Sequence, residues 1–322
     1  MADATSPSSQ PPARAFAHVM ACVGVSPSSG LVVREAAQLA RVCGARLTLF
    51  HAGSERETVE QIVREAAGDE PLLGDAPVLG REGQPDRVIL EEARRQNADL
   101  VFAGALASDP LLTGILGSVA RRLARNADRS LFLSIHRFPP EAVARTIVAS
   151  VGFDERSQAM ALATARLAMN GRAGELHIVR EYDPYSDRAT ETTGAAGADS
   201  KRWEHVLETA TRFELANFLE GLSRKLGDGE SGPRGAAALE GAGVTLRTAC
   251  MAGRGGEEVA RYAERVGADL LVMPAPERRL GLLDRFFGHP TETLLERFPC
   301  SVLLFRRLKK GEQSEHPAGT AP

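Results

Sequence analysis

Short runs of consecutive apolar residues alternate along this chain with longer segments in which apolar residues recur every third or fourth position. The runs are unbroken, which is typical of strands covered on both faces by helices. They are LTLF at 47–50, LVFA at 100–103, LFLSI at 131–135, LLVM at 270–273 and SVLLF at 301–305. The longer segments have a helical period, for example in Val32, Ala36, Leu39, Ala40 and Cys43. Strands that alternate with helices predict right-handed crossovers and a doubly wound, mostly parallel sheet.

The same order of elements occurs twice along the chain. Residues 17–52 and 145–180 each read as an apolar strand, a Val-Gly pair, a polar turn, an Ala-rich helix, a Gly break and a second strand. The segments that follow also match, 81–104 with 252–275 and 114–134 with 283–305. Such self-similarity predicts two copies of one structural unit. We therefore predict an α/β fold with two tandem, doubly wound, Rossmann-like sheets, each five-stranded, mostly parallel and flanked by helices.

The boundary between the copies is expected near Pro139-Pro140, which interrupts the pattern. The predicted domains are 15–138 and 144–307, with disordered tails at 1–14 and 308–322. The second copy is longer: a long helix from about Lys201 to Leu226 lies between two stretches predicted to be inserted loops, 181–200 and 227–243. In the first copy we expect Ser28 or Ser29 to cap the first helix and Gly44 to end it.

Composition and charge narrow the function classes. A length of 322 residues, roughly twice a typical domain of about 150, agrees with two units. A net charge of −3 gives no overall electrostatic case for binding nucleic acid or a membrane surface. The sequence has no apolar stretch of signal-peptide or transmembrane type. The four cysteines form no CxxC pair or zinc-type spacing, so we expect a reducing cytoplasmic compartment and no protein-bound metal.

The candidate chemistry lies in the loop at 104–119. In a doubly wound sheet, ligands bind at the carboxyl ends of the strands where the strand order reverses. Here Gly104 and Ala107 follow a predicted strand, and Gly117-Ser118 opens the next helix. Small residues allow the backbone to approach a phosphate, and the amides at a helix N-terminus stabilise its charge. This pattern predicts a phosphate-binding loop in the first copy.

The loop and its surroundings resemble the universal stress protein family, whose nucleotide-binding members carry Gly-x2-Gly-x9-Gly-Ser/Thr. The match here is Gly104-x2-Ala107-x9-Gly117-Ser118, with alanine in place of one glycine. SPSS (26–29), GARLTLFH (44–51) and NADLVFAG (97–104) are also similar to that family, and the resemblance covers about 16–136 and 144–306. It implies an adenine nucleotide α-hydrolase-like fold and a bound adenine nucleotide such as ATP, with Mg as a companion of ATP. The implied binding residues are Val23, Gly24, Val25, His51, Gly104, Ala107, Gly117, Ser118 and Val119.

Two departures from the family pattern matter. Relatives that bind nucleotide usually have an Asp after the first strand, where this chain has Gly24 and Gly152. In the second copy, Pro274 stands where Gly104 stands in the first, and Pro276 follows it. Proline has no N–H to offer a phosphate. We therefore expect the first copy to hold the nucleotide and the second to be degenerate.

Family members often dimerise through the fifth strand. In this tandem chain we expect 130–135 and 301–306 to pair within one molecule as a pseudo-dimer, because an uncovered edge strand is sticky. Further dimerisation into a homodimer stays open, as do the protein partners.

Three functions remain in contention. The leading one is a stress-response protein that responds to a nucleotide without catalysis, since the sequence lacks a Walker loop, a nucleophile elbow or a zinc-hydrolase motif. The first alternative is a nucleotide-free scaffold or interaction module, which Gly24 and Ala107 favour. The second alternative is a weak ATP hydrolase.

Overall fold

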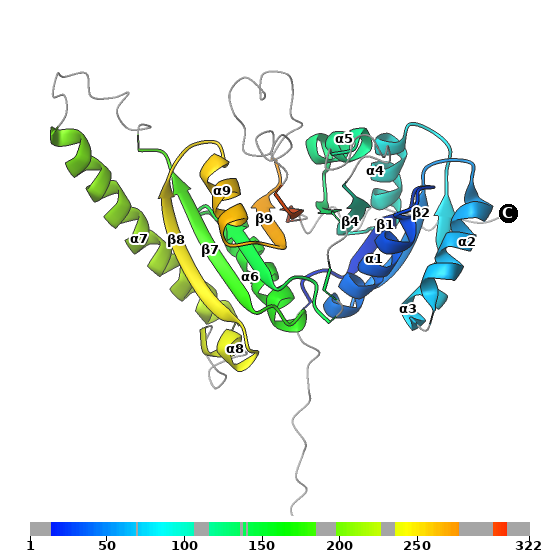
Figure 1. Cartoon of the computed structure of the whole chain (residues 1–322), viewed down its shortest axis with the longest axis horizontal. Helices are drawn as coiled ribbons and strands as arrows, with labels where there is room; N and C mark the ends of the chain where they lie inside the picture. The colour runs from blue at the N-terminus through cyan, green and yellow to red at the C-terminus, as the bar shows by residue number, and fades with distance from the viewer. Residues whose placement is uncertain are drawn as a thin grey trace, which may run out of the picture.

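The computed structural model describes residues 14–68, 70–105, 116–135, 138–139, 141–184, 198–226, 236–276 and 299–307. The tails expected at 1–14 and 308–322 lie outside this part, Arg14 excepted. The described residues form one ten-stranded sheet in the order β3-β2-β1-β4-β5-β10-β9-β6-β7-β8. Each sequence copy supplies five consecutive strands of it, and Figure 1 shows the two halves side by side. The predicted tandem α/β fold is confirmed.

The elements of the first half follow the predicted alternation. They are β1 (His18–Cys22), α1 (Ser29–Cys43), β2 (Arg46–His51), α2 (Arg56–Ala67), α3 (Pro71–Gly74), β3 (Val78–Gly80), α4 (Pro85–Arg95), β4 (Leu100–Gly104), α5 (Ser118–Asn126) and β5 (Ser130–Ser134). Strand β1 pairs in parallel with β2 and β4, and β5 extends the sheet beyond β4. Gly44 ends α1 in the left-handed conformation, at φ 59°, as its position predicted.

The second half repeats this arrangement with a longer insertion. Its elements are β6 (Thr146–Ser150), α6 (Glu155–Asn170), β7 (Glu175–Tyr182), α7 (Ala198–Leu226), α8 (Ala236–Gly241), β8 (Thr245–Ala252), α9 (Glu257–Arg265), β9 (Leu270–Pro274) and β10 (Ser301–Phe305). Strand β6 pairs in parallel with β7 and β9, as β1 does with β2 and β4.

The inserted segments differ from the expected loops. Residues 181–182 belong to β7, and 198–200 belong to α7. The predicted loop at 227–243 contains helix α8, because AAALEG is rich in strong helix formers. On α7, Leu215, Phe218 and Leu222 are buried, whereas Phe213 is 68% exposed. Only one face of this long helix therefore packs against the sheet.

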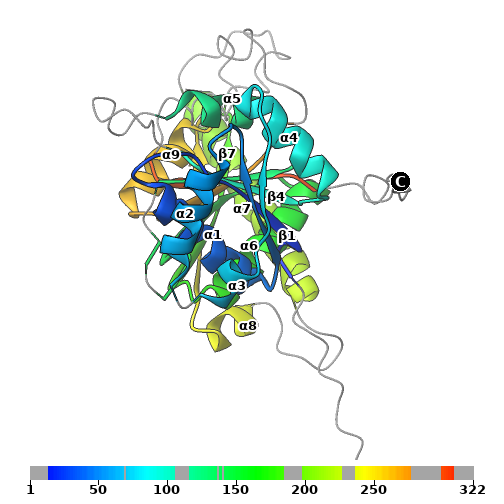
Figure 2. The same ribbon diagram turned by 90° about the vertical axis from the view of Figure 1, so that its right-hand side faces the viewer.

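Helices cover both faces of the sheet and divide its core into two layers. Apolar residues of α1, α2, α6 and α7 form one layer, and those of α4, α5 and α9 form the other. In Figure 2, α4 and α5 lie on one side of the strands, and α1, α3 and α6 on the other. The unbroken apolar strands are buried along nearly their whole length, as this two-sided cover requires. No helix among the described residues is both long and apolar enough to cross a membrane.

The two halves join through β5 and β10, which pair antiparallel. The predicted pairing of these strands within one molecule is therefore confirmed. Ser130 closes the junction: its Oγ donates to the Arg306 carbonyl at 3.1 Å and accepts from the Arg306 amide at 3.0 Å. On the other strand, Ser301 Oγ accepts from the Ile135 amide at 3.2 Å.

A buried polar cluster on α1 fixes the linker between the halves. Glu35 is 7% exposed and accepts from Ser134 Oγ at 2.5 Å and from the Phe138 amide at 3.2 Å. Gln38, one turn further along α1, donates to the carbonyls of Pro139 and Ala142 at 3.1 and 3.0 Å. The linker after β5 is thus held against α1 by specific hydrogen bonds.

Matching aspartates pin the first strand of each half. Asp99 accepts from the amides of Ala17 and His18 at 2.8 and 2.9 Å. Asp269 accepts from the amides of Arg145 and Thr146 at 2.7 and 3.1 Å. Both lie at the amino ends of the strands, so their recurrence in the sequence is structural.

Candidate functional site

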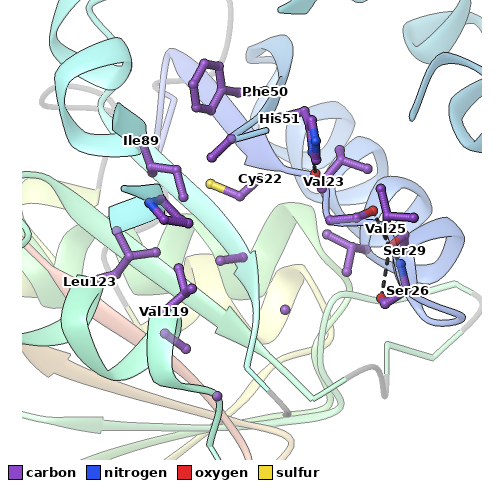
Figure 3. A pocket seen from close by; sticks show the side chains of 18 of the residues that line it. Cys22, Val23, Val25, Ser26, Ser29, Phe50, His51, Ile89, Val119 and Leu123 are labelled. Atoms are coloured by element: carbon purple, nitrogen blue, oxygen red, sulfur yellow. Dashed lines mark hydrogen bonds between the residues drawn. The ribbon is translucent and has the colours of Figure 1, made fainter. Parts of the chain in front are cut away.

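A cavity of about 810 Å³ opens at the carboxyl ends of β1 and β4. Strands β2 and β4 flank β1 on opposite sides, so this is the point where the strand order of the first half reverses. Its walls come from the turn after β1, the end of β2, the start of α4, the end of β4 and the start of α5 (Figure 3). A cavity of this size accommodates a nucleotide-sized molecule.

The residues predicted from the sequence converge on this cavity. Those that line it are Val23, Gly24, Val25, His51, Gly104, Gly117, Ser118 and Val119. Ala107 lies outside the described residues. The structure thus brings together residues from four segments that are distant in sequence. Their role in binding stays a prediction.

The turn after β1 is held by three serine side chains. Ser29 Oγ donates to the Gly24 carbonyl at 2.6 Å and accepts from the Ser26 amide at 3.0 Å. Ser26 Oγ lies 2.9 Å from Ser29 Oγ and 3.2 Å from Ser28 Oγ. Ser28 does stand at the N-cap position of α1, but it makes no side-chain capping bond. The position of the cap is therefore as expected, but the side-chain hydrogen bond of a serine cap is absent.

Gly24 leaves open space in this turn. A Cβ built on Gly24 would meet no heavy atom within 4 Å, and its φ lies outside the left-handed region. Val25 beside it is 51% exposed. A side chain at position 24 can therefore be accommodated without backbone strain, next to the cavity that Gly24 lines.

His51 joins the end of β2 to the turn after β1. Its ring is buried at 5% exposure, with Nδ1 2.8 Å from the Val23 carbonyl and Nε2 3.1 Å from Glu55 Oε2 (Figure 3). Because a carbonyl only accepts, Nδ1 carries a proton and donates it to Val23. The hydrogen bond from His51 lowers the pKa of Glu55 from its ordinary value. Both ring nitrogens are thus engaged within the wall.

The N-terminus of α5 forms the opposite wall. The Gly117 amide donates to the Ala105 carbonyl at 2.8 Å and so fixes where the helix begins. Ser118, Val119 and Ala120 occupy its first turn, where amides have no intrahelical acceptor, and all three line the cavity. Arg121 also lines it and donates from Nε to the Leu116 carbonyl at 3.2 Å. This end of the cavity combines helix-terminal amides, a hydroxyl and a guanidinium.

The interior of the cavity is apolar. Phe50, Ile89 and Leu123 surround the space into which the Cys22 sulfur points (Figure 3). Burial raises the pKa of the Cys22 thiol to about 12. The thiol therefore stays protonated at neutral pH and acts as an apolar wall atom, not as a nucleophile.

Sequence reasoning missed several lining residues. Glu55 had no signal in the sequence, because it follows His51 by four residues across a turn that is neither strand nor helix. Arg121 follows Ser118 by three residues on the same helix and lines the cavity, but the loop pattern does not include it. Ile89 had no local signal, because its place depends on how α4 packs across the sheet.

The second half has a smaller cavity of about 300 Å³ at the equivalent place. Pro274 and Pro276 line it, so prolines do occupy the strand end where the first half has Gly104. At the start of α9, Glu181 accepts from the amides of Gly256 and Glu258 at 2.6 and 3.0 Å. A carboxylate of the chain itself thus occupies this helix N-terminus.

Within the described ranges, no group of three or more His, Cys, Asp or Glu side chains is arranged so that it could hold a metal ion.

Comparison with known proteins identifies relatives of this fold. The model of the universal stress protein family matches residues 15–133 and 144–306. A putative universal stress protein from Pseudomonas aeruginosa UCBPP-PA14 superposes with a TM-score of 0.61 at 17% identity, covering 90% of this chain and 93% of that one. A protein of unknown function from Pseudomonas aeruginosa PAO1 gives 0.59 at 17% identity, covering 90% and 92%. A universal stress protein from Archaeoglobus fulgidus gives 0.55 at 13% identity, covering 90% and 98%.

At these identities the solved structures establish the fold and not the ligand. The search for curated relatives of the chain found no match.

Proposed function

Because the chain belongs to the universal stress protein family, we propose that it acts in a stress response and binds an adenine nucleotide, ATP first among them, in the cavity of its first half. One observation carries the proposal: the described residues among those predicted line a single cavity of about 810 Å³, which has an apolar interior and helix-terminal amides at one end. An apolar pocket with a few convergent polar groups is the usual form of a small-molecule site.

The phosphates are assigned to the start of α5. The amides of Ser118, Val119 and Ala120 would donate to phosphate oxygens, and the positive end of the helix dipole favours their charge. The Ser118 hydroxyl adds a donor, and Arg121 adds a guanidinium. The base is assigned to the apolar wall near Ile89 and the turn at Val23–Val25.

Magnesium would enter with the nucleotide. Among the described lining residues, Glu55 is the carboxylate, and His51 already engages it. A Mg²⁺ ion bound with ATP would therefore be held mainly by phosphate oxygens and water, and the Ser118 hydroxyl would be the side-chain oxygen available to it at the phosphate end.

We assign no catalysis to the site. A hydrolase needs a group free to activate water. The His51 ring is bonded to the Val23 carbonyl through one nitrogen and to Glu55 through the other, and burial raises the pKa of Cys22 so that its thiol stays protonated. The role that follows is ligand-dependent ordering of the site, read out by a protein partner. Phosphate release from ATP above the background of a Ser118→Asp variant would favour the weak hydrolase instead.

The nucleotide-free scaffold remains the second candidate. Gly24 favours it, because the open space at this position lacks the carboxylate expected near the ribose. The second half, with its smaller proline-lined cavity, is assigned a structural or regulatory role.

Calorimetric titration of the full chain with ATP, ADP and AMP tests the proposal. We expect binding that Ser118→Asp abolishes, since a carboxylate at the start of α5 would repel the phosphates. Arg121→Met should weaken ATP more than AMP, while the matched control Arg64→Met, an exposed change on α2, should leave both unchanged. Absence of heat at millimolar nucleotide, with all variants identical to the parent, would support the scaffold.

A further inference from the structure

Arg180 takes the place in the second half that His51 takes in the first. His51 directly follows Phe50, which pairs with Cys22, and Arg180 directly follows Val179, which pairs with Ser150. Both side chains bond to the strand at the matching carbonyl. His51 Nδ1 lies 2.8 Å from the Val23 carbonyl, and Arg180 Nη1 donates to the Val151 carbonyl at 3.3 Å.

The two side chains differ in the hydrogen-bond partners of their remaining nitrogen atoms. The second nitrogen of His51 has Glu55. In Arg180, Nε is buried and has no hydrogen-bond partner among the described residues. Within the same residues, no carboxylate oxygen lies within 4.0 Å of this guanidinium, as the ion pairs of the second half show. A buried donor without an acceptor is costly, and an unseen water or ion is its usual explanation.

The neighbouring carboxylates are committed elsewhere. Asp154 accepts from the Ser157 amide at 2.8 Å and from Arg156 at 3.2 Å. Glu181 accepts from the two amides at the start of α9. Asp183 lies 3.7 Å from Arg254. The positive charge of Arg180 therefore has no direct counter-ion in the described part of the chain.

The guanidinium is also held in a fixed orientation. Its central carbon lies 4.9 Å from the centroid of the Phe153 ring, which itself packs against Phe218. With Nη1 bonded to Val151, the edge formed by Nε and Nη2 is the one left to bind a ligand. That edge presents two parallel N–H groups, the arrangement that binds an oxyanion through two oxygens at once.

Arg180 lines the cavity of about 300 Å³ at the carboxyl ends of β6, β7 and β9. We propose that the second half carries a separate site for a small oxyanion, a phosphate group first, with Arg180 as its binding residue. Ser157 lines the same cavity, but its Oγ accepts from the Gly152 amide at 2.8 Å and its hydroxyl bonds to the Asp154 carboxylate, so Arg180 is the donor left for the ligand. The cavity is less than half the volume of the nucleotide cavity, so the ligand is smaller than ATP.

Nuclear magnetic resonance of arginine Nε–H groups in the full-length, ¹⁵N-labelled chain tests this directly. The resonance that disappears in Arg180→Met is assigned to Arg180. Arg224→Met, which removes an exposed arginine on α7, is the matched control and should leave that resonance in place. Inorganic phosphate added at constant ionic strength should shift the Arg180 signal saturably. Arg180→Lys, which keeps the charge but loses the two-pronged edge, should weaken phosphate binding about tenfold or more, measured by calorimetry.

The outcome is separable from the nucleotide proposal. The titration is repeated in the Ser118→Asp background, in which phosphate cannot occupy the first half. We expect the Arg180 shift to persist there, whether or not the first half binds ATP. No saturable shift of Arg180 Nε, equal phosphate affinity in Arg180→Lys and the parent chain, or loss of the shift in Ser118→Asp would each overturn the proposal.

Discussion

Restoring a carboxylate at position 24 is the most informative single change in the first half. Nucleotide-binding members of the family usually carry Asp there, next to the ribose, whereas this chain has Gly24. A Cβ at this position meets nothing within 4 Å and requires no left-handed backbone, so Gly24→Asp should fold normally. The new carboxylate would lie beside the cavity of about 810 Å³ and accept hydrogen bonds from a ribose.

The expected gain can be bounded. A hydrogen bond to a charged group is worth about 1.5–3 kcal/mol. The turn is partly exposed, as Val25 shows, so we take the lower end for one net bond. About 1.5 kcal/mol corresponds to roughly tenfold tighter binding. Repulsion from phosphates at the far wall is screened over a Debye length of about 8 Å at physiological salt and reduces the gain only partly.

Calorimetry with ATP measures this gain directly. Gly24→Asn, similar in size but uncharged, should recover less of it. Gly74→Asp, an equally open glycine in α3 that does not line the cavity, should leave ATP affinity unchanged. If Gly24→Asp folds but binds ATP no more tightly than the parent chain, or if Gly74→Asp matches it, the reasoning about the ribose end of the site is refuted.

Three further predictions concern the wall of the site and the joint between the halves. Glu35→Ala should lower the free energy of unfolding, measured in urea, by about 1–3 kcal/mol, because Ser134 and the Phe138 amide lose their buried acceptor. Glu65→Ala on the surface of α2 should have little effect, and equal effects of the two changes would contradict the role given to Glu35. Alkylation of Cys22 at pH 8, followed by peptide mass spectrometry, should be slow, and its rate should rise with pH toward about 12, since desolvation raises the thiol pKa. Rapid labelling at pH 8 would contradict a protonated thiol. Because folding lowers the pKa of Glu55, the ionised carboxylate contributes stability above its ordinary pKa of 4.5, and this contribution is lost as the pH falls through the folded pKa. The difference in unfolding free energy between the parent chain and Glu55→Gln should therefore shrink below pH 4.5. A constant difference would mean that the His51–Glu55 bond is not what stabilises this wall.

Much of the fold followed from patterns local in the chain. The unbroken apolar runs located buried strands such as β4 and β9, and the repeated order of elements predicted two units. Gly44 was placed correctly at the end of α1, because a left-handed helix end strongly favours glycine. These features depend on backbone preference and on periodicity, which a single sequence displays.

The errors and omissions involve long-range or competing contacts. Ser28 stands at the N-cap of α1 without a capping bond, and its hydroxyl lies against Ser26 Oγ instead, within the turn after β1. Ile89 reaches the cavity only through the packing of α4, and Arg180 is equivalent to His51 only through the strand register. The pairing of β5 with β10 was foreseen from the family resemblance, not from the apolar runs themselves.

We propose that each chain has one nucleotide site, in its first half, and none in its second. Native mass spectrometry of the full chain with ATP tests it most directly. We expect a single ATP per chain in the parent protein and none in Ser118→Asp. Two ATP molecules per chain, or one that persists in Ser118→Asp, would contradict it.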